Sequence, residues 1–220
     1  MSGGAEGSAT PMFALQTVLL PTAALPLHVF EPRYVAMLDN VLAGDHEMGV
    51  VLIERGREVG GGDARCNVAT MARVVRHQAL GDGRMLVMAA GIRRIRVLHW
   101  LPDDPFPCAE TQDWPDEPDG ASRPASELVP ELAALVARAL GLATSLRLGF
   151  TPPPELAEPV EVDLGDDPGE ASYRAAALAP LGPLDRYEVL RTPGVHQRLE
   201  VACRVVAEAA EVLQARIELG

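Results

Sequence analysis

The chain contains no lysine, because all 19 of its basic residues are arginine. A nucleotide-binding P-loop needs a lysine after its glycines to reach the β- and γ-phosphates, so ATP hydrolysis by that device is excluded. A serine hydroxyl is a weak nucleophile without a neighbouring base, and no serine–lysine dyad can be assembled here. None of the six serines has the G-x-S-x-G spacing of a hydrolase nucleophile. We therefore expect no enzymatic activity.

Cysteine and histidine are sparse, and neither shows the spacing of a metal site. The three cysteines, Cys66, Cys108 and Cys203, are far apart and form no C-x-x-C pair. The five histidines contain no H-x-x-x-H or H-E-x-x-H arrangement. Zinc sites and dithiol redox centres use such closely spaced ligands. We expect reduced thiols, no metal site and no cofactor.

Long apolar runs and targeting signals are missing as well. No stretch approaches the roughly 18 uninterrupted apolar residues of a membrane span. Met1 to Met12 carry no basic residue ahead of an apolar run, unlike a secretory signal. These features predict a cytoplasmic chain with no membrane partner. Aromatic residues make up only 4% of the chain, so its core must consist mostly of Leu, Val, Ala and Ile.

The first half of the sequence has the pattern of β structure, with apolar or alternating runs separated by clusters of Gly, Pro and Asp. The longest run has Gly91 near its middle, where we expect a bulge or a bend. One early helix is predicted at about Pro32 to Ala43. Strands are expected at Val18–Leu20, Leu25–Val29, Met48–Ile53, Asn67–Leu80, Met85–Trp100 and Pro107–Trp114.

The second half, after the acidic and Pro-rich stretch Trp114 to Gly120, has helical periodicity. A helix is predicted to begin near Ser126, with Pro130 in or before its first turn. Shorter helices are expected at about Ala171–Ala179 and Pro183–Arg191. The last helix carries an apolar stripe that favours packing inside a bundle over a dimer seam. Its members are Val195, Leu199, Ala202, Val206, Ala209 and Leu213.

One segment is improbable as generic core sequence: Leu25-Pro26-Leu27-His28-Val29-Phe30-Glu31-Pro32-Arg33-Tyr34. An ordinary strand-to-helix junction would explain its pattern of polarity but not this particular string. The segment resembles the opening signature of the Lon N-terminal substrate-recognition domain. The resemblance extends over about residues 13 to 213. Further similar segments are Met48–Ile53 with Gly56, Ala69–Val74, Gly91–Val97 and Leu181–Arg186.

This resemblance implies an α+β fold with an N-terminal β pseudo-barrel of the PUA-like, Lon N-domain type and a C-terminal helical bundle. The expected boundaries are a disordered N-terminus at 1–12, a β lobe at 13–118 and a helical lobe at 119–220. The implied role is non-catalytic recognition of unfolded or damaged polypeptides, as an adaptor to a protease or chaperone in protein quality control. Such binding needs an exposed apolar groove, expected between the two lobes, with Phe30, Arg33, Tyr34 and Met37 as candidate contacts near its rim. Phe30, Tyr34 and Met37 are equally compatible with buried core.

The charge distribution leaves one alternative function open. The net charge is −12, yet between Arg65 and Trp100 seven arginines face one acid, Asp82. Arg93, Arg94 and Arg96 could form a basic contact patch, and PUA-like barrels also occur in RNA-binding modules. These arginines could equally alternate outward on solvated strands. An isoelectric point near 4.8 and few aromatic residues for base stacking argue against nucleic acid as a partner.

Overall fold

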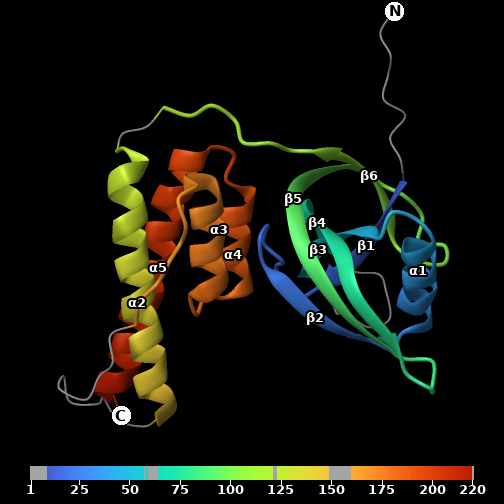
Figure 1. Cartoon of the computed structure of the whole chain (residues 1–220), viewed down its shortest axis with the longest axis horizontal. Helices are drawn as coiled ribbons and strands as arrows, with labels where there is room; N and C mark the ends of the chain where they lie inside the picture. The colour runs from blue at the N-terminus through green and yellow to red at the C-terminus, as the bar shows by residue number, and fades with distance from the viewer. Residues whose placement is uncertain (1–8, 57, 59–63, 121–122, 149–159, 220) are drawn as a thin grey trace, which may run out of the picture. The chain divides into compact units, whose positions relative to one another are not determined.

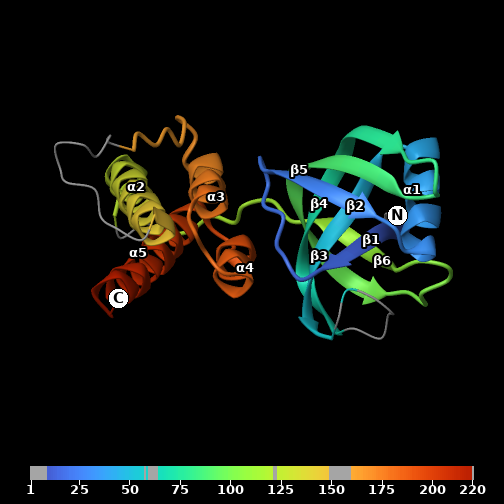
Figure 2. The same ribbon diagram turned by 90° about the horizontal axis from the view of Figure 1, so that it is seen from below.

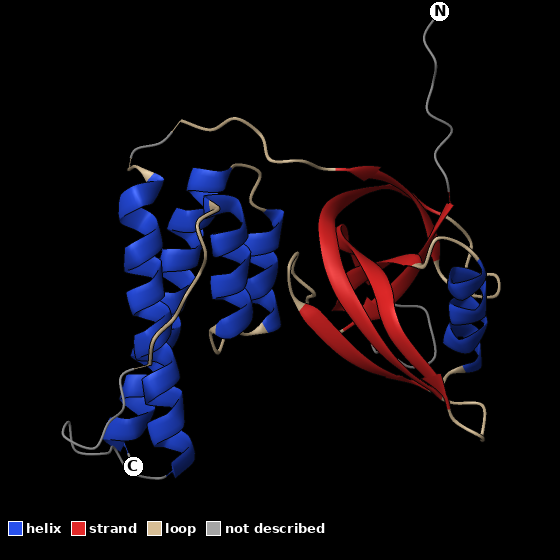
Figure 3. Ribbon diagram, in the orientation of Figure 1, coloured by secondary structure: helices blue, strands red, loops and turns tan. Residues whose placement is uncertain are grey.

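The structure is a computed structural model that describes residues 9–56, 58, 64–120, 123–148 and 160–219. Its contacts divide the chain into two compact units, the first ending at Pro115 and the second beginning at Asp116. The first unit contains six strands and one helix, whereas the regular elements described in the second are all helices (Figure 1, Figure 3). The predicted α+β class with C-terminal helices is confirmed.

The strands of the first unit form one mixed sheet in the order β2-β5-β4-β3-β1-β6. Only β1 and β3 run parallel among the described pairs. The sheet curls strongly, because the C-terminal half of β5 also pairs with β6 while its N-terminal half pairs with β2. The unit is a pseudo-barrel and not a closed barrel. Its elements are β1 (Ala9–Leu15), β2 (Ala24–Val29), α1 (Pro32–Ala43), β3 (Glu47–Arg55), β4 (Ala64–Ala79), β5 (Met85–Trp100) and β6 (Cys108–Asp113).

The predicted bend in β5 is confirmed at Gly91. The β4–β5 register shifts beside it and leaves Ile92 as the extra residue of a bulge. A Cβ atom at position 91 would lie 2.3 Å from the carbonyl oxygen of Leu20, so only glycine fits. The Gly91 N–H donates to the Ala23 carbonyl at 2.8 Å, and the Gly91 carbonyl accepts from the Thr22 N–H at 2.9 Å.

The start of the chain differs from expectation. Ordered structure begins before residue 13, because β1 starts at Ala9 and its first residues pair with β6; residues 1–8 lie outside the described part. The predicted strand Val18–Leu20 is wrong, since this segment is buried but irregular. Its apolar side chains indicate burial but not strand structure. A strand also needs backbone hydrogen bonds to a partner strand, which can lie far away in the sequence.

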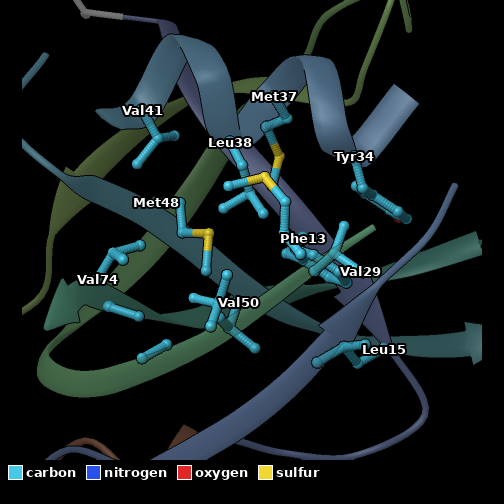
Figure 4. Close-up of a cluster of buried hydrophobic side chains, with 14 of the residues drawn as sticks. Phe13, Leu15, Val29, Tyr34, Met37, Leu38, Val41, Met48, Val50 and Val74 are labelled. Atoms are coloured by element: carbon cyan, nitrogen blue, oxygen red, sulfur yellow. The ribbon is translucent and has the colours of Figure 1, made fainter. Parts of the chain in front are cut away.

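Helix α1 has the predicted bounds and covers one end of the curled sheet. Pro32 occupies the first turn, where its missing N–H costs nothing. Side chains at helical spacing point from α1 into the strands, as Figure 4 shows for Met37, Leu38 and Val41 above Met48. The core of the first unit is therefore built largely of aliphatic and methionine side chains, with Phe13 and Tyr34 as its aromatic pair.

The second unit is a helical bundle in which α5 packs along α2 and also contacts α3 and α4 (Figure 1, Figure 2). The predicted bounds of α4 are confirmed. The expectation for Pro130 is wrong, because it lies inside α2: the N–H groups of Glu127 and Leu128 already bond to the Pro124 carbonyl. The helices are α2 (Ala125–Leu148), α3 (Pro168–Leu178), α4 (Pro183–Arg191) and α5 (Val195–Leu219).

A fully buried arginine lies at the centre of the second unit. Arg198 of α5 has no exposed surface. Its guanidinium bonds to the Asp116 carboxylate at 2.6 and 3.0 Å, and its Nε donates to the Ser172 hydroxyl at 2.7 Å. The guanidinium also lies 4.2 Å from the ring centroid of Tyr173. These contacts satisfy a buried charge that would otherwise cost several kcal/mol.

One described helix is long and apolar enough to cross a membrane by length and composition alone. It is α2, over Ala125–Arg147, with a mean hydropathy of 1.4. The sequence expectation of no such stretch rested on uninterrupted apolar runs, and α2 contains a few charged residues. In the structure Leu128, Leu132 and Val136 of this helix are buried within the helical bundle.

Candidate functional site

The sheet of the first unit has an open seam between β1 and β2, formed by the unpaired edges of Ala14–Gln16 and of Pro26–Val29. On the β1 side, side chains occupy the backbone donors that a neighbouring strand would otherwise take. The Ala14 N–H donates to the Tyr34 hydroxyl at 3.3 Å, and the Gln16 N–H donates to the Glu58 carboxylate at 2.5 Å. β6 reaches only the earlier part of this edge, at Ala9 to Pro11.

On the other side of the seam, β2 pairs with no described strand except β5. Just before β2, the Ala23 carbonyl accepts a hydrogen bond from the Gly91 N–H of β5. Because backbone groups alternate in direction along a strand, the N–H and carbonyl groups of the odd-numbered residues of β2 also face β5. The even-numbered residues turn theirs to the open edge. Pro26 suits this position because it has no N–H to offer the ladder. His28 therefore presents both an N–H and a carbonyl at the open edge.

A cavity of about 200 Å³ lies in this seam and is lined from both strands. Phe13 and Tyr34 form its aromatic part, with their rings stacked at 4.1 Å between centroids and 7° between planes. Leu27 and Val29 add aliphatic side chains from β2. A cavity of about 150 Å³ already holds benzene in an apolar core. The seam cavity therefore has room for one large apolar side chain.

The rim of the cavity is charged. Glu31 and Glu58 are among its lining residues. Arg33 bonds to the Glu31 carboxylate at 3.1 Å and donates to the Glu58 carbonyl at 2.7 Å, which ties α1 to the segment after β3. The Arg33 guanidinium also lies 4.5 Å from the ring centroid of Tyr34. Among the described residues, two carboxylates and one guanidinium give the rim an excess of negative charge.

The four residues predicted from the sequence have different environments, and three of them lie in or beside this seam. Phe30 lines the cavity and is 54% exposed, an unusual position for a large aromatic side chain. Tyr34 also lines it but is almost fully buried, and Arg33 lies at the rim. Met37 is fully buried in the core below α1. The core interpretation thus describes Met37 and Tyr34, whereas Phe30 is available at the surface.

The predicted basic patch does not present free charge. Arg93 bonds to Glu47 and Asp113, both at 2.8 Å. Arg94 is buried and donates to the Trp114 carbonyl at 3.2 Å. The guanidinium groups of Arg94 and Arg96 lie 4.2 and 4.0 Å from the ring centroid of Trp114. No observation here favours phosphate binding.

A larger cavity, of about 500 Å³, lies near the end of α1 and is mostly polar. Its charged lining includes Glu47, Arg93 and Asp113, which already pair with one another. In another part of the lining, the hydroxyl groups of Thr10 and Thr111 form a hydrogen bond of 2.7 Å with each other. These polar groups satisfy one another, so the cavity offers less to a ligand than the seam does.

Within the described residues, we find no clustering of nucleophilic or metal-binding side chains. Burial raises the pKa of the Cys203 thiol to about 11, and burial together with Asp103 raises the pKa of the Cys108 thiol. Both thiols are protonated and unreactive at neutral pH. In the described part of the chain, no three His, Cys, Asp or Glu side chains converge as a metal site.

Sequence reasoning missed Glu58 and the open edge of His28. Glu58 caps a backbone N–H that is 42 residues away in sequence, so no local spacing could predict this contact. His28 was expected to point away from Leu27 and Val29, and the structure confirms that its side chain is exposed. The open edge follows only once the pairing of β2 is known.

Comparison with known proteins points to one family. The family model described as the ATP-dependent protease La (LON) substrate-binding domain matches residues 9–208. The chain is 26% identical over 208 residues to the Lon protease of Phenylobacterium zucineum and 27% identical over 206 residues to Lon protease 1 of Herpetosiphon aurantiacus. These matches cover 94% and 91% of the chain but 25% and 24% of the relatives. The chain thus spans about a quarter of the length of these curated relatives.

Solved structures show the same similarity. The Lon N-terminal domain protein from Xanthomonas campestris superposes with a TM-score of 0.60 at 26% identity, covering 88% of this chain and 95% of that one. The N-terminal domain of the Mycobacterium avium complex Lon protease has a TM-score of 0.61 at 16% identity, covering 91% of this chain and 99% of that one. The second match supports the fold alone.

Proposed function

The chain belongs to the family of the ATP-dependent protease La (LON) substrate-binding domain, and from this premise we propose that it binds exposed apolar segments of unfolded or damaged polypeptides at the seam between β1 and β2. The proposed role is an adaptor in protein quality control that performs no catalytic step itself. The whole-length Lon relatives supply the analogy for protein substrates.

The observation that carries the proposal is the exposed Phe30 beside an apolar cavity. Binding sites are typically concave and lined by apolar and aromatic side chains, and Phe30 lies exposed beside such a cavity. The cavity, the unpaired strand edges and Phe30 lie together within one unit. Apolar binding surfaces of this kind suit the side chains that become exposed when proteins unfold.

The proposal is tested by fluorescence anisotropy of a labelled, permanently unfolded polypeptide titrated with the purified chain, without nucleotide. We expect saturable binding of the unfolded polypeptide and none of its folded form or of a random RNA oligomer. Phe30→Ala should weaken binding about tenfold, because it removes most of one aromatic contact.

Val75→Ala is the matched control, since Val75 is 59% exposed in the same unit but does not line the cavity. It should leave binding unchanged. Equal weakening by both variants would show that general surface hydrophobicity is being measured. Absence of binding to the unfolded polypeptide would contradict the proposed function itself.

A further inference from the structure

We infer that the seam takes its polypeptide as an added β-strand on the open edge of β2, with one bulky apolar side chain in the cavity and a basic residue beside it. The inference rests on the proposed function and specifies the chemistry of the segment that is bound. It follows from three observations on the seam: the backbone groups of β2, the size of the cavity and the charge of its rim.

The backbone of β2 offers a short and defined pairing site. His28 turns its N–H and carbonyl to the open edge, and Pro26 contributes a carbonyl but no N–H. An extended segment opposite His28 can therefore exchange two hydrogen bonds and donate a third to Pro26. Pro26 also prevents a long ladder, which limits the edge to brief pairing and guards against sheet-to-sheet aggregation.

The cavity sets which side chain is preferred. In an extended segment alternate side chains point to opposite faces, so only one residue near His28 can enter the cavity. A volume of about 200 Å³ between Phe13, Leu27 and Tyr34 suits Phe, Leu or Met. Phe30, half exposed at the cavity mouth, can cover the side chain that enters.

The charge of the rim sets what flanks that residue. In the described part of the rim, Glu31 and Glu58 outnumber Arg33, which is itself paired with Glu31. The whole chain adds a net charge of −12, which attracts basic segments and repels acidic ones over longer distances. A lysine or arginine next to the inserted residue would meet the Glu58 carboxylate, whose present partner is the Gln16 N–H.

Labelled nonapeptides with a single central phenylalanine test all three features against the full chain. With lysines flanking the phenylalanine we expect saturable binding. Replacing the phenylalanine by alanine should weaken it at least tenfold. Replacing the lysines by glutamates should also weaken it, and this difference should shrink as salt is raised. Glu58→Gln should reduce the preference for lysine, whereas Glu54→Gln, exposed and outside the cavity lining, should not.

Backbone N-methylation distinguishes a strand from any other bound conformation. Methyl groups on alternate residues should abolish binding in one register and have little effect in the other, because only alternate N–H groups face β2. His28→Pro should weaken binding as the harmful methylation does. Ala24→Pro lies on the same edge but away from the cavity and should leave binding unchanged.

The outcomes separate this inference from the proposed function. If unfolded polypeptide binds but methylation in either register acts equally, the function stands and strand addition is wrong. If lysine and glutamate peptides bind alike, the charge preference is wrong. If the chain forms a dimer that His28→Pro dissociates, a second copy occupies the edge and the inference is overturned. If neither unfolded polypeptide nor peptide binds, the proposed function fails as well.

Discussion

The two units of this protein satisfy their polar groups in opposite ways. The β unit leaves strand edges open at the seam and covers two of the backbone donors with the side chains of Tyr34 and Glu58. The helical unit instead encloses a charge, because Arg198 is fully buried and bonded to Asp116 and Ser172. Side-chain caps can be exchanged for another partner, whereas a buried guanidinium that depends on its carboxylate partner resists such exchange. This difference supports placing the proposed binding site in the first unit.

The segment after Trp114 belongs to the helical unit through several independent contacts. Asp116 reaches Arg198, and the Glu117 N–H donates to the Pro193 carbonyl at 3.1 Å. Asp119 accepts from the Gln197 N–H at 2.9 Å, near the start of α5. The acidic and Pro-rich stretch before α2 thus caps the N-terminus of α5 and neutralises a buried arginine.

The largest effect is expected from Arg198→Ala, which tests whether the helical unit depends on its buried charge. Removal of the guanidinium takes away both bonds to the Asp116 carboxylate and leaves a cavity beside Tyr173, so the free energy of unfolding should fall by about 3 kcal/mol. Urea unfolding monitored by circular dichroism measures this change. Arg204→Ala is the control, because that side chain is 47% exposed and its ion pairs should contribute no more than about 1 kcal/mol. Similar losses in the two variants would contradict the special role of Arg198.

The next effect is expected in the β unit, from Gly91→Ala. The added Cβ would meet the Leu20 carbonyl at 2.3 Å, so the backbone must shift and stability should fall by about 2 kcal/mol. Gly81→Ala provides the comparison, because a Cβ there meets nothing within 4 Å. The urea unfolding midpoints of both variants, compared with that of the wild type, measure the loss of stability. A Gly91→Ala protein as stable as the wild type would show that the bend in β5 accommodates a Cβ atom at position 91.

A smaller, pH-dependent effect is expected from Asp119→Ala. Burial alone would raise the pKa of the Asp119 carboxyl, but hydrogen bonds from the Gln197 N–H and the His196 ring outweigh it and hold this pKa below its ordinary value of 3.8. Because the folded state disfavours protonation, the contribution of Asp119 is complete above the unfolded pKa and is lost as pH falls through the folded pKa.

The loss of this cap should cost about 1 kcal/mol at pH 7. The difference in urea stability between wild type and Asp119→Ala should therefore narrow as the pH falls below about 4. Asp185→Ala is a suitable comparison, because Asp185 lies in the first turn of α4 and no side chain caps the start of that helix. A stability difference that is constant from pH 7 to pH 3 would show that the carboxylate charge is not what caps α5.

The smallest effect on stability is expected from Phe30→Ala, which should change the free energy of unfolding by less than about 0.5 kcal/mol because the side chain is half exposed. The same substitution is expected to weaken polypeptide binding. Met37→Ala should behave in the opposite way and cost 2 kcal/mol or more, roughly, because Met37 is fully buried. A large stability loss in Phe30→Ala would place Phe30 in the core and remove the basis of the seam site.

Much of the local structure could be predicted from the sequence. Helix α1 was predicted with its observed bounds because Pro32 marks its first turn and its apolar residues have helical spacing. The bend of β5 follows from a glycine within a run that is too long for one flat strand. The motif from Leu25 to Tyr34 also indicated the family before any contact was known. In each case neighbouring residues carry the whole signal.

Other features depend on partners that lie far away in sequence. β1 escaped prediction because its buried residues do not alternate and its pairing with β3 and β6 is tertiary. Arg198 stands between Gln197 and Leu199 in the sequence, and only the approach of Asp116, 82 residues away, allows its burial.

The sequence by itself determined the family, the two-part α+β organisation and the absence of lysine-dependent chemistry, because these are properties of residue identity and short-range spacing. Tertiary structure decided which predicted residues are accessible: Phe30 lies at the surface, whereas Met37 is in the core. It also decided that the edge of β2 is open and that the arginines of β5 are paired. These features arise when strands distant in the chain set their register, and register fixes which backbone groups and side chains still face solvent.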